Sequence, residues 1–168
     1  GTWHKGIDIN LKTGGDTDWG YPAQSMFPGT VVFAQDRVTS WGGIVLIRSD
    51  PWVVQLVADL TGVVLDVLDV QYAHFHQVTV KEGDIVNSGD HLGSLGKGTN
   101  NSWWAHLHLE MRRTKRPAAE GQGKTDAHKA SVKKHYLDPL HIMDVLTFSD
   151  FGNILPRRVL TAPHEGGM

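Results

Sequence analysis

The stretch KEGDIVNSGDHLG at residues 81–93 decides the fold class of this chain. Glycine stands at positions 83, 89 and 93, and strand-favouring residues such as Ile85 and Val86 lie between these glycines. Glycine accepts a positive φ at no steric cost, so these positions allow the backbone to reverse repeatedly. The stretch therefore predicts a narrow β structure of short strands and tight turns.

The segments on both sides of this stretch extend the same pattern. Residues 30–34 and 44–48 are rich in β-branched residues and follow a Pro-Gly and a Gly-Gly pair, and such residues favour strands. Residues 3–9, 63–75 and 104–111 also have strand character. We therefore predict a mostly β fold.

Two segments depart from the strand pattern. Asp50, Pro51 and Gly62 supply an N-cap, a first helical position and a C-cap glycine. Apolar residues between them recur at helical spacing, which predicts a short helix around 51–61; the alternative is a long β-hairpin, because the valines here also favour strands. Residues 112–135 lose apolar periodicity and gain Lys, Arg, Gly and Ala, which predicts a loop insertion.

Composition limits the chemistry. The chain has 168 residues, ten histidines and no cysteine, which is enough length to bury a core without disulfides. Thiolate metal sites and cysteine nucleophiles are excluded, so any metal must be held by His, Asp or Glu, as suits zinc or another borderline ion. The 16 basic and 18 acidic residues nearly balance, which argues against non-specific nucleic-acid binding. No apolar run is long enough to span a membrane.

Metal-compatible side chains gather at His4 and Asp8 and at His106 and His108. Side chains two or four residues apart on a strand share a face. His106 and His108 therefore point the same way, whereas His4 and Asp8 would lie about 13 Å apart on a straight strand. A bend at Gly6, or the arrival of Asp8 from a turn, is needed to bring the second pair onto one ion.

A third cluster, Tyr72-Ala73-His74-Phe75-His76, adds two histidines. A catalytic zinc takes three protein ligands and keeps a fourth position for water, whose pKa the metal lowers. Further histidines nearby can move protons or stabilise an oxyanion. Spacing alone leaves open whether a metal site exists, and which histidines bind the metal.

Together these segments resemble the lysostaphin-type zinc endopeptidases that cut bacterial cell-wall peptides. The resemblance covers residues 3–140 and lies in six motifs that occur in the family's order. These motifs are HKGID at 4–8, PGTVVFA at 28–34, GIVLI at 43–47, YAHF at 72–75, VKEGDIV with GDHLG at 80–93, and AHLHLE at 105–110.

The resemblance implies the roles of the site residues. It assigns one Zn²⁺ per chain to His4, Asp8 and His108, and general acid–base or oxyanion-stabilising work to His74 and His106. It also implies a compact antiparallel β architecture, a sandwich-like barrel built on a duplicated hybrid motif, with a groove over the metal.

The resemblance also implies the biology. The expected activity is hydrolysis of peptidoglycan peptide bonds, in a cross-bridge or stem peptide, by a metal-activated water assisted by two histidines. We expect an extracellular, periplasmic or phage-associated monomer that binds no nucleic acid. Residues 1–145 would form a single peptidase domain and residues 146–168 a partly flexible extension. Because the chain begins at Gly1 without Met, we expect a mature or excised piece.

Some residues depart from the family pattern. His76 adds a histidine that would share a face with His74 if the strand continued, and so is a second candidate for the catalytic role. Trp103 and Trp104 replace small residues before the AHLHLE motif, so they either wall the groove or pack in the core. We predict substrate contacts for Tyr72 and Trp104.

Three other readings compete with a peptidase. A phosphocarrier domain of the glucose-type IIA kind would use His74 and His106 as a phosphate pair, but would not need His4 and Asp8. A biotinyl- or lipoyl-type carrier fits residues 80–96 but lacks a lysine at a hairpin tip. An inactive wall-recognition module would keep the metal without hydrolysis.

Overall fold

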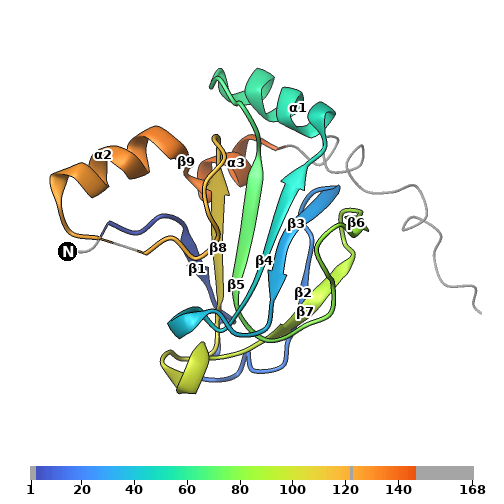
Figure 1. Cartoon of the computed structure of the whole chain (residues 1–168), viewed down its shortest axis with the longest axis vertical. Helices are drawn as coiled ribbons and strands as arrows, with labels where there is room; N and C mark the ends of the chain where they lie inside the picture. Colours follow the sequence, from blue (N-terminus) through green and yellow to red (C-terminus); the bar gives the residue numbers. More distant parts are fainter. Residues whose placement is uncertain (1–2, 122, 147–168) are drawn as a thin grey trace, which may run out of the picture.

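The computed structural model describes residues 3–121 and 123–146. Within them one antiparallel sheet runs in the order β1-β8-β5-β4-β3-β6, while β7 joins β5 to β2, and β9 pairs with β8 (Figure 1). The strands are β1 (Ile7–Ile9), β2 (Pro22–Gln24), β3 (Gly29–Gln35), β4 (Gly43–Ser49), β5 (Asp69–Val78), β6 (Ile85–Val86), β7 (His91–Leu95), β8 (Leu107–Arg112) and β9 (Tyr136–Leu137). The predicted mostly β, antiparallel fold is confirmed.

Alternating residues of the central strands build the core. Val45 and Ile47 of β4 and Tyr72 of β5 are buried on one face together with Leu109 of β8, because successive side chains of a strand point to opposite faces. Burial of each such side chain contributes about 1.5–3 kcal/mol to the free energy of unfolding. The other face of β5 and β8 is thereby left to carry polar groups.

The helix predicted around 51–61 is α1 (Pro51–Thr61). Pro51 occupies its first turn, and Gly62 ends it with a φ of 68° and an N–H that donates to the Ala58 carbonyl. Val53 and Val57 are buried against the sheet. Contact with α3 (Pro139–Val145) places both helices at one end of the sheet (Figure 1).

The prediction of a loop over 112–135 is partly wrong. β8 extends to Arg112, and Asp126–His135 form α2. The Thr125 side chain accepts a hydrogen bond from the His128 N–H and caps this helix. No residue of α2 is buried, so the helix stands on the surface and shows none of the apolar periodicity that predicts helices.

The strands predicted at 63–75 and 104–111 begin later, at Asp69 and Leu107. Two 3₁₀ turns, η1 (Thr39–Trp41) and η2 (Thr99–Asn101), contact each other beside the sheet. Within the described residues no helix is long and apolar enough to cross a membrane. The extension predicted over 146–168 lies outside the described residues apart from Leu146.

A cluster of charged residues attaches the segment after β8 to the start of the chain. The buried Lys5 Nζ donates to the Glu120 carbonyl at 2.9 Å and lies 3.3 Å from its carboxylate. Arg116 pairs with the same carboxylate, and the Tyr136 hydroxyl donates to it at 2.6 Å. Burial alone would raise the pKa of Glu120, but these partners outweigh burial and lower the pKa to about 2.

The depressed pKa of Glu120 predicts acid sensitivity of the fold. A carboxylate whose folded pKa lies below its unfolded value stabilises the fold above the unfolded pKa and loses this contribution as the pH falls through the folded pKa. The free energy of unfolding should therefore decline between pH about 4.5 and about 2. In urea titrations across this range, Glu120→Gln should flatten the decline, and the exposed Glu82→Gln should not. An unchanged slope in Glu120→Gln would contradict this account.

Candidate metal centre and active site

The register of β1 against β8 brings two of the predicted metal ligands together. Asp8 of β1 lies directly opposite His108 of β8, and side chains of directly paired residues share a face with Cβ atoms about 4.5–5.5 Å apart. Asp8 Oδ1 is 2.8 Å from His108 Nδ1. The cross-strand pair therefore supplies two converging donor atoms.

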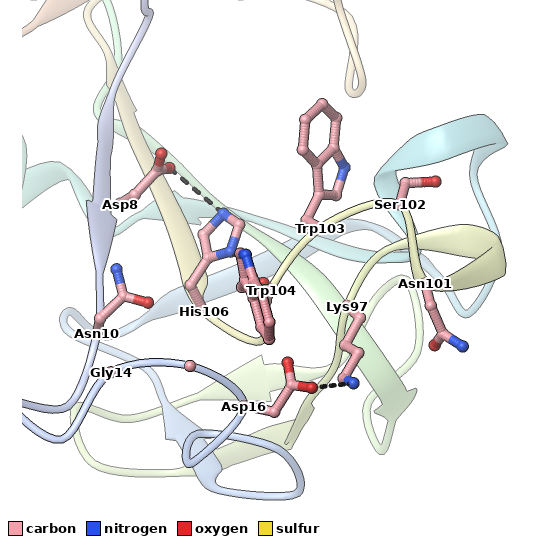
Figure 2. Close-up of a pocket in the computed structure, with 11 residues that line it drawn as sticks. Asp8, Asn10, Gly14, Asp16, Lys97, Asn101, Ser102, Trp103, Trp104 and His106 are labelled. Atoms are coloured by element: carbon pink, nitrogen blue, oxygen red, sulfur yellow. Dashed lines mark hydrogen bonds and ion pairs between the residues drawn. The ribbon is translucent and has the colours of Figure 1, made fainter.

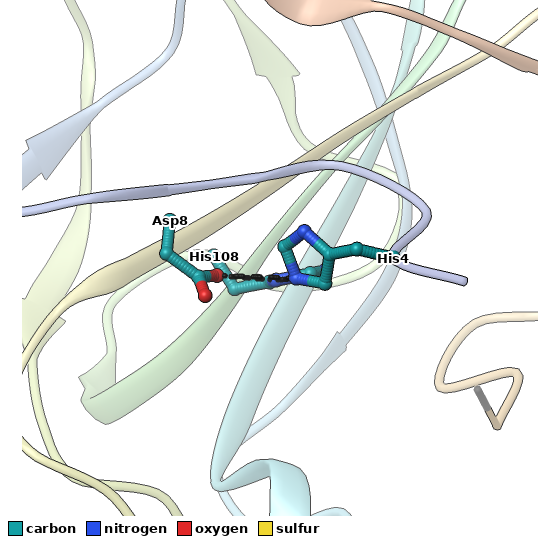
Figure 3. A group of neighbouring side chains, drawn as sticks. All are labelled: His4, Asp8 and His108. Atoms are coloured by element: carbon teal, nitrogen blue, oxygen red, sulfur yellow. Dashed lines mark hydrogen bonds and ion pairs between the residues drawn. The ribbon is translucent and has the colours of Figure 1, made fainter. Parts of the chain in front are cut away.

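His4 reaches the same point because the chain bends at Lys5 and Gly6. His4 Nε2 lies 3.1 Å from His108 Nδ1 and 3.4 Å from Asp8 Oδ1 (Figure 3). At this bend the backbone lies against β8, where a Cβ on Gly6 would come within 2.0 Å of the Leu109 carbonyl oxygen. The bend expected from the HKGID motif is therefore present, and only glycine fits it.

The three donor atoms suit a zinc ion. Ligands at about 2.0–2.1 Å from a tetrahedral zinc stand roughly 3.3 Å from one another. The observed separations of 2.8, 3.1 and 3.4 Å bracket this value. Among the described residues these three side chains form the cluster able to hold a metal, and two imidazoles with one carboxylate are ligands that zinc accepts.

A buried chain of charges orients His108 from behind. His108 Nε2 lies 3.1 Å from Glu110 Oε1, and the other Glu110 oxygen accepts from Arg112 Nη2. Arg112 also donates to the Gln71 amide oxygen at 2.7 Å. Because Glu110 occupies Nε2, Nδ1 of His108 is the nitrogen that faces the metal centre.

His74 reaches the site through a β-bulge. Ile44 pairs with Ala73 and Gly43 with Phe75, so His74 is an extra residue in β5 and has a φ of 70°. Simple alternation from the buried Tyr72 would direct His74 into the core, and the bulge redirects it instead. His74 Nδ1 donates to the Trp41 carbonyl at 2.8 Å, and its ring stacks on Trp41.

His106 lies beside His74, with ring centroids 4.5 Å apart. Its Nδ1 donates to the Trp104 carbonyl at 2.6 Å, and its Nε2 is 3.6 Å from Asp8 Oδ1. In both histidines, therefore, Nδ1 is tied to a backbone carbonyl and Nε2 remains for chemistry at the centre.

Burial and hydrogen bonding favour a neutral His74 and an ionised Asp8. Burial is the main cause that lowers the pKa of His74, to about 4, so this ring is neutral near pH 7. For Asp8, burial opposes ionisation, but hydrogen bonds with His108 and His4 outweigh it and hold the pKa well below its ordinary value. The site thus contains an ionised carboxylate that could bind a metal and a neutral imidazole able to accept a proton.

A groove crosses the metal centre. Cavities of about 860 and about 340 Å³ meet at Asp8, Trp103 and His106. Figure 2 shows the larger one, which Trp104 also lines with a 70% exposed side chain. The smaller cavity includes Trp41 and His74.

Not every predicted residue reaches this groove. Tyr72 is only 2% exposed, and its hydroxyl accepts from the Met26 N–H at 2.8 Å, so it belongs to the core and the predicted substrate contact is wrong. His76 packs on Trp19 with ring centroids 4.7 Å apart and does not join the metal cluster. Trp41 and Asp16, which both contact site segments, belong to no motif and were not predicted.

Comparisons with known proteins identify a family and a shared fold. The family model described as peptidase family M23 matches residues 2–120, and no curated protein matches the chain. Among solved structures, the catalytic domain of lysostaphin from Staphylococcus simulans aligns with a TM-score of 0.57 and 18% identity, covering 84% of this chain and 79% of that one.

Two further structures align over most of the chain. LytU gives a TM-score of 0.54 and 21% identity, over 92% of this chain and 86% of that one. The catalytic domain of the prophage-encoded M23 protein EnpA from Enterococcus faecalis gives 0.51 and 24%, over 68% and 72%. Against the full lysostaphin, the chain covers 51% of that protein. At these identities the alignments establish the shared fold.

The close approach at Gly6 generates a prediction. Gly6→Ala forces the segment before β1 away from Leu109, at a cost of about 1–3 kcal/mol, and displaces His4 from the other two donors. We expect a lower midpoint in thermal unfolding and weaker zinc binding by calorimetry. Gly121→Ala, where the added Cβ meets nothing within 4 Å, is the matched control. Wild-type zinc affinity in Gly6→Ala would show that the bend does not position His4.

Proposed function

Because the chain belongs to peptidase family M23, we propose that it is a zinc-dependent endopeptidase that hydrolyses peptide bonds of bacterial peptidoglycan. The observation that carries this proposal is the triangle of donor atoms from His4, Asp8 and His108, faced by two histidines whose Nε2 atoms remain available. The proposed sites of action are the cell exterior, the periplasm or a phage particle.

The three proposed zinc ligands and the two histidines contribute different parts of the chemistry. When bound by His4, Asp8 and His108, zinc supplies Lewis-acid polarisation of the substrate carbonyl and a water of lowered pKa. Neutral His74 offers Nε2 as a proton acceptor because its Nδ1–H is committed to Trp41. His106 has the same arrangement through Trp104 and lies close enough to share the proton transfers.

The two histidines can accept and return the protons that hydrolysis of a peptide bond requires. Water adds to the scissile carbonyl carbon, and its proton passes to a histidine Nε2. The C–N bond then breaks, and the amine nitrogen takes up a proton from a histidine that holds one. A histidine N–H that points at the substrate oxygen stabilises the charge that develops there.

The groove supports a peptide substrate. Its two cavities share Asp8, Trp103 and His106 in their linings, so an extended chain can pass over the centre through both of them. Trp104 and Trp103 offer exposed aromatic surface along this path. The aromatic wall supports the predicted substrate contact of Trp104.

The ligand and catalytic roles predict different consequences of substitution. His108→Ala removes the donor shared by both other ligands, so zinc content by elemental analysis should fall from about one per chain to near zero. His106→Ala should keep the zinc and lose about 10²- to 10⁴-fold in kcat on a peptidoglycan peptide. His76→Ala is the control and should retain both. If His106→Ala and His108→Ala both keep full turnover, the proposed mechanism is wrong.

A wall assay separates the enzyme from an inactive recognition module. Purified peptidoglycans with glycine cross-bridges and with direct stem-peptide cross-links, digested and analysed by mass spectrometry, should yield new amino termini from at least one of them. Metal removal by a chelator should stop the release, and added zinc should restore it. Binding to the wall without any cleavage would favour the recognition module.

A further inference from the structure

Asp16 reaches from the loop after β1 to the segment that carries His106. Asp16 Oδ1 accepts a hydrogen bond from the Ala105 N–H at 3.1 Å, and its other oxygen pairs with Lys97 (Figure 2). This hydrogen bond with Lys97 is the main cause that lowers the pKa of Asp16 below its ordinary value. Ala105 is fully buried and directly precedes His106.

The peptide unit between Trp104 and Ala105 is held at both ends. Its N–H donates to Asp16, and its carbonyl accepts from His106 Nδ1 at 2.6 Å. A hydrogen bond to a carboxylate is stronger than one between neutral groups, and hydrogen bonds in a chain polarise one another by roughly 10–30% per bond. A negative charge on Asp16 therefore makes the Trp104 carbonyl a better acceptor for the imidazole N–H.

We propose that Asp16 is a positioning residue for His106, which it orients through the Trp104–Ala105 peptide. The carboxylate fixes this peptide, the peptide carbonyl holds the proton on Nδ1, and Nε2 is left bare beside Asp8. The inference rests on the proposed function, in which His106 moves a proton at the metal centre.

Hydrogen bonds within residues 11–18 hold the loop that carries Asp16. Asp18 is buried and accepts the Leu11 N–H with both carboxylate oxygens, at 3.0 and 3.1 Å. The Thr17 hydroxyl donates to the Gly14 carbonyl at 2.8 Å, and Gly14 takes a positive φ of 68°. These contacts close the loop on itself, so the position of Asp16 does not depend on substrate.

The test compares variants of the full zinc-loaded chain. Asp16→Ala should keep one zinc per chain and its KM, while kcat falls about 10- to 100-fold, as for loss of a partner that orients an active-site group. Asp16→Asn keeps the shape and an acceptor oxygen but not the charge, so its loss should be smaller. Asp16→Asn also tests the positioning role of Asp16 if Asp16→Ala fails to fold.

A spectroscopic readout addresses the tautomer directly. In ¹⁵N-histidine NMR spectra, His106 should be an Nδ1–H tautomer in the wild type and a mixture of tautomers in Asp16→Ala. Lys97→Met removes the ion pair but keeps the Asp16–Ala105 hydrogen bond, so its His106 tautomer should resemble that of the wild type. Asp84→Asn, in a distant exposed turn where the carboxylate accepts the Lys81 N–H at 2.9 Å, is the second control.

The outcomes separate the two proposals. An unchanged tautomer and kcat in Asp16→Ala would overturn the positioning role, and so would an equal tautomer change in Lys97→Met, which would assign the effect to the ion pair. If His106→Ala itself keeps full kcat, the proposed mechanism fails. The tautomer shift in Asp16→Ala would still report whether Asp16 orients this ring.

Discussion

The antiparallel register of β1 on β8 is the constraint on which the rest of the site depends. It places Asp8 opposite His108 and, in the same ladder, Ile7 opposite the buried Leu109. A slip by one residue would turn every side chain of β1 to the other face. The packing that buries Leu109 and the geometry that joins two proposed metal ligands are therefore one choice of register, and Gly6 permits the approach that this register requires.

β8 combines two functions through its alternation. Leu109 and Met111 face the core, whereas His108, Glu110 and Arg112 form a polar row on the other face that is at most 1% exposed. Buried charges are tolerated only when they are paired and hydrogen-bonded. The segment after β8 meets this need, since the carbonyls of Arg116 and Pro117 accept from the Arg112 guanidinium. This part of the insertion covers the polar row behind the proposed metal ligand His108.

Local periodicity predicted the parts of the site that follow simple strand rules. His106 and His108 lie on one side because they are two residues apart, and the need for a bend at Gly6 followed from the length of a straight strand. The bulge at His74 does not follow from these rules, because an extra residue in β5 depends on how this strand pairs with β4, β7 and β8. β5 shifts its register against β7 again between Phe75 and Gln77, and His76, which lies between them, packs on Trp19 instead of joining His74.

The contribution of Asp16 depends on tertiary structure in the same way. Its sequence neighbours are glycine and threonine in a loop, and only folding brings its carboxylate to a peptide 89 residues away. The two proposed catalytic histidines use the same local device, a backbone carbonyl on Nδ1, but the chain supplies it differently. His74 depends on a positive φ, which costs about 1–3 kcal/mol, and on the carbonyl of η1. His106 depends on the carbonyl just before it, which a carboxylate from another loop polarises. Because the two supports are independent, changing one should leave the orientation of the other histidine intact.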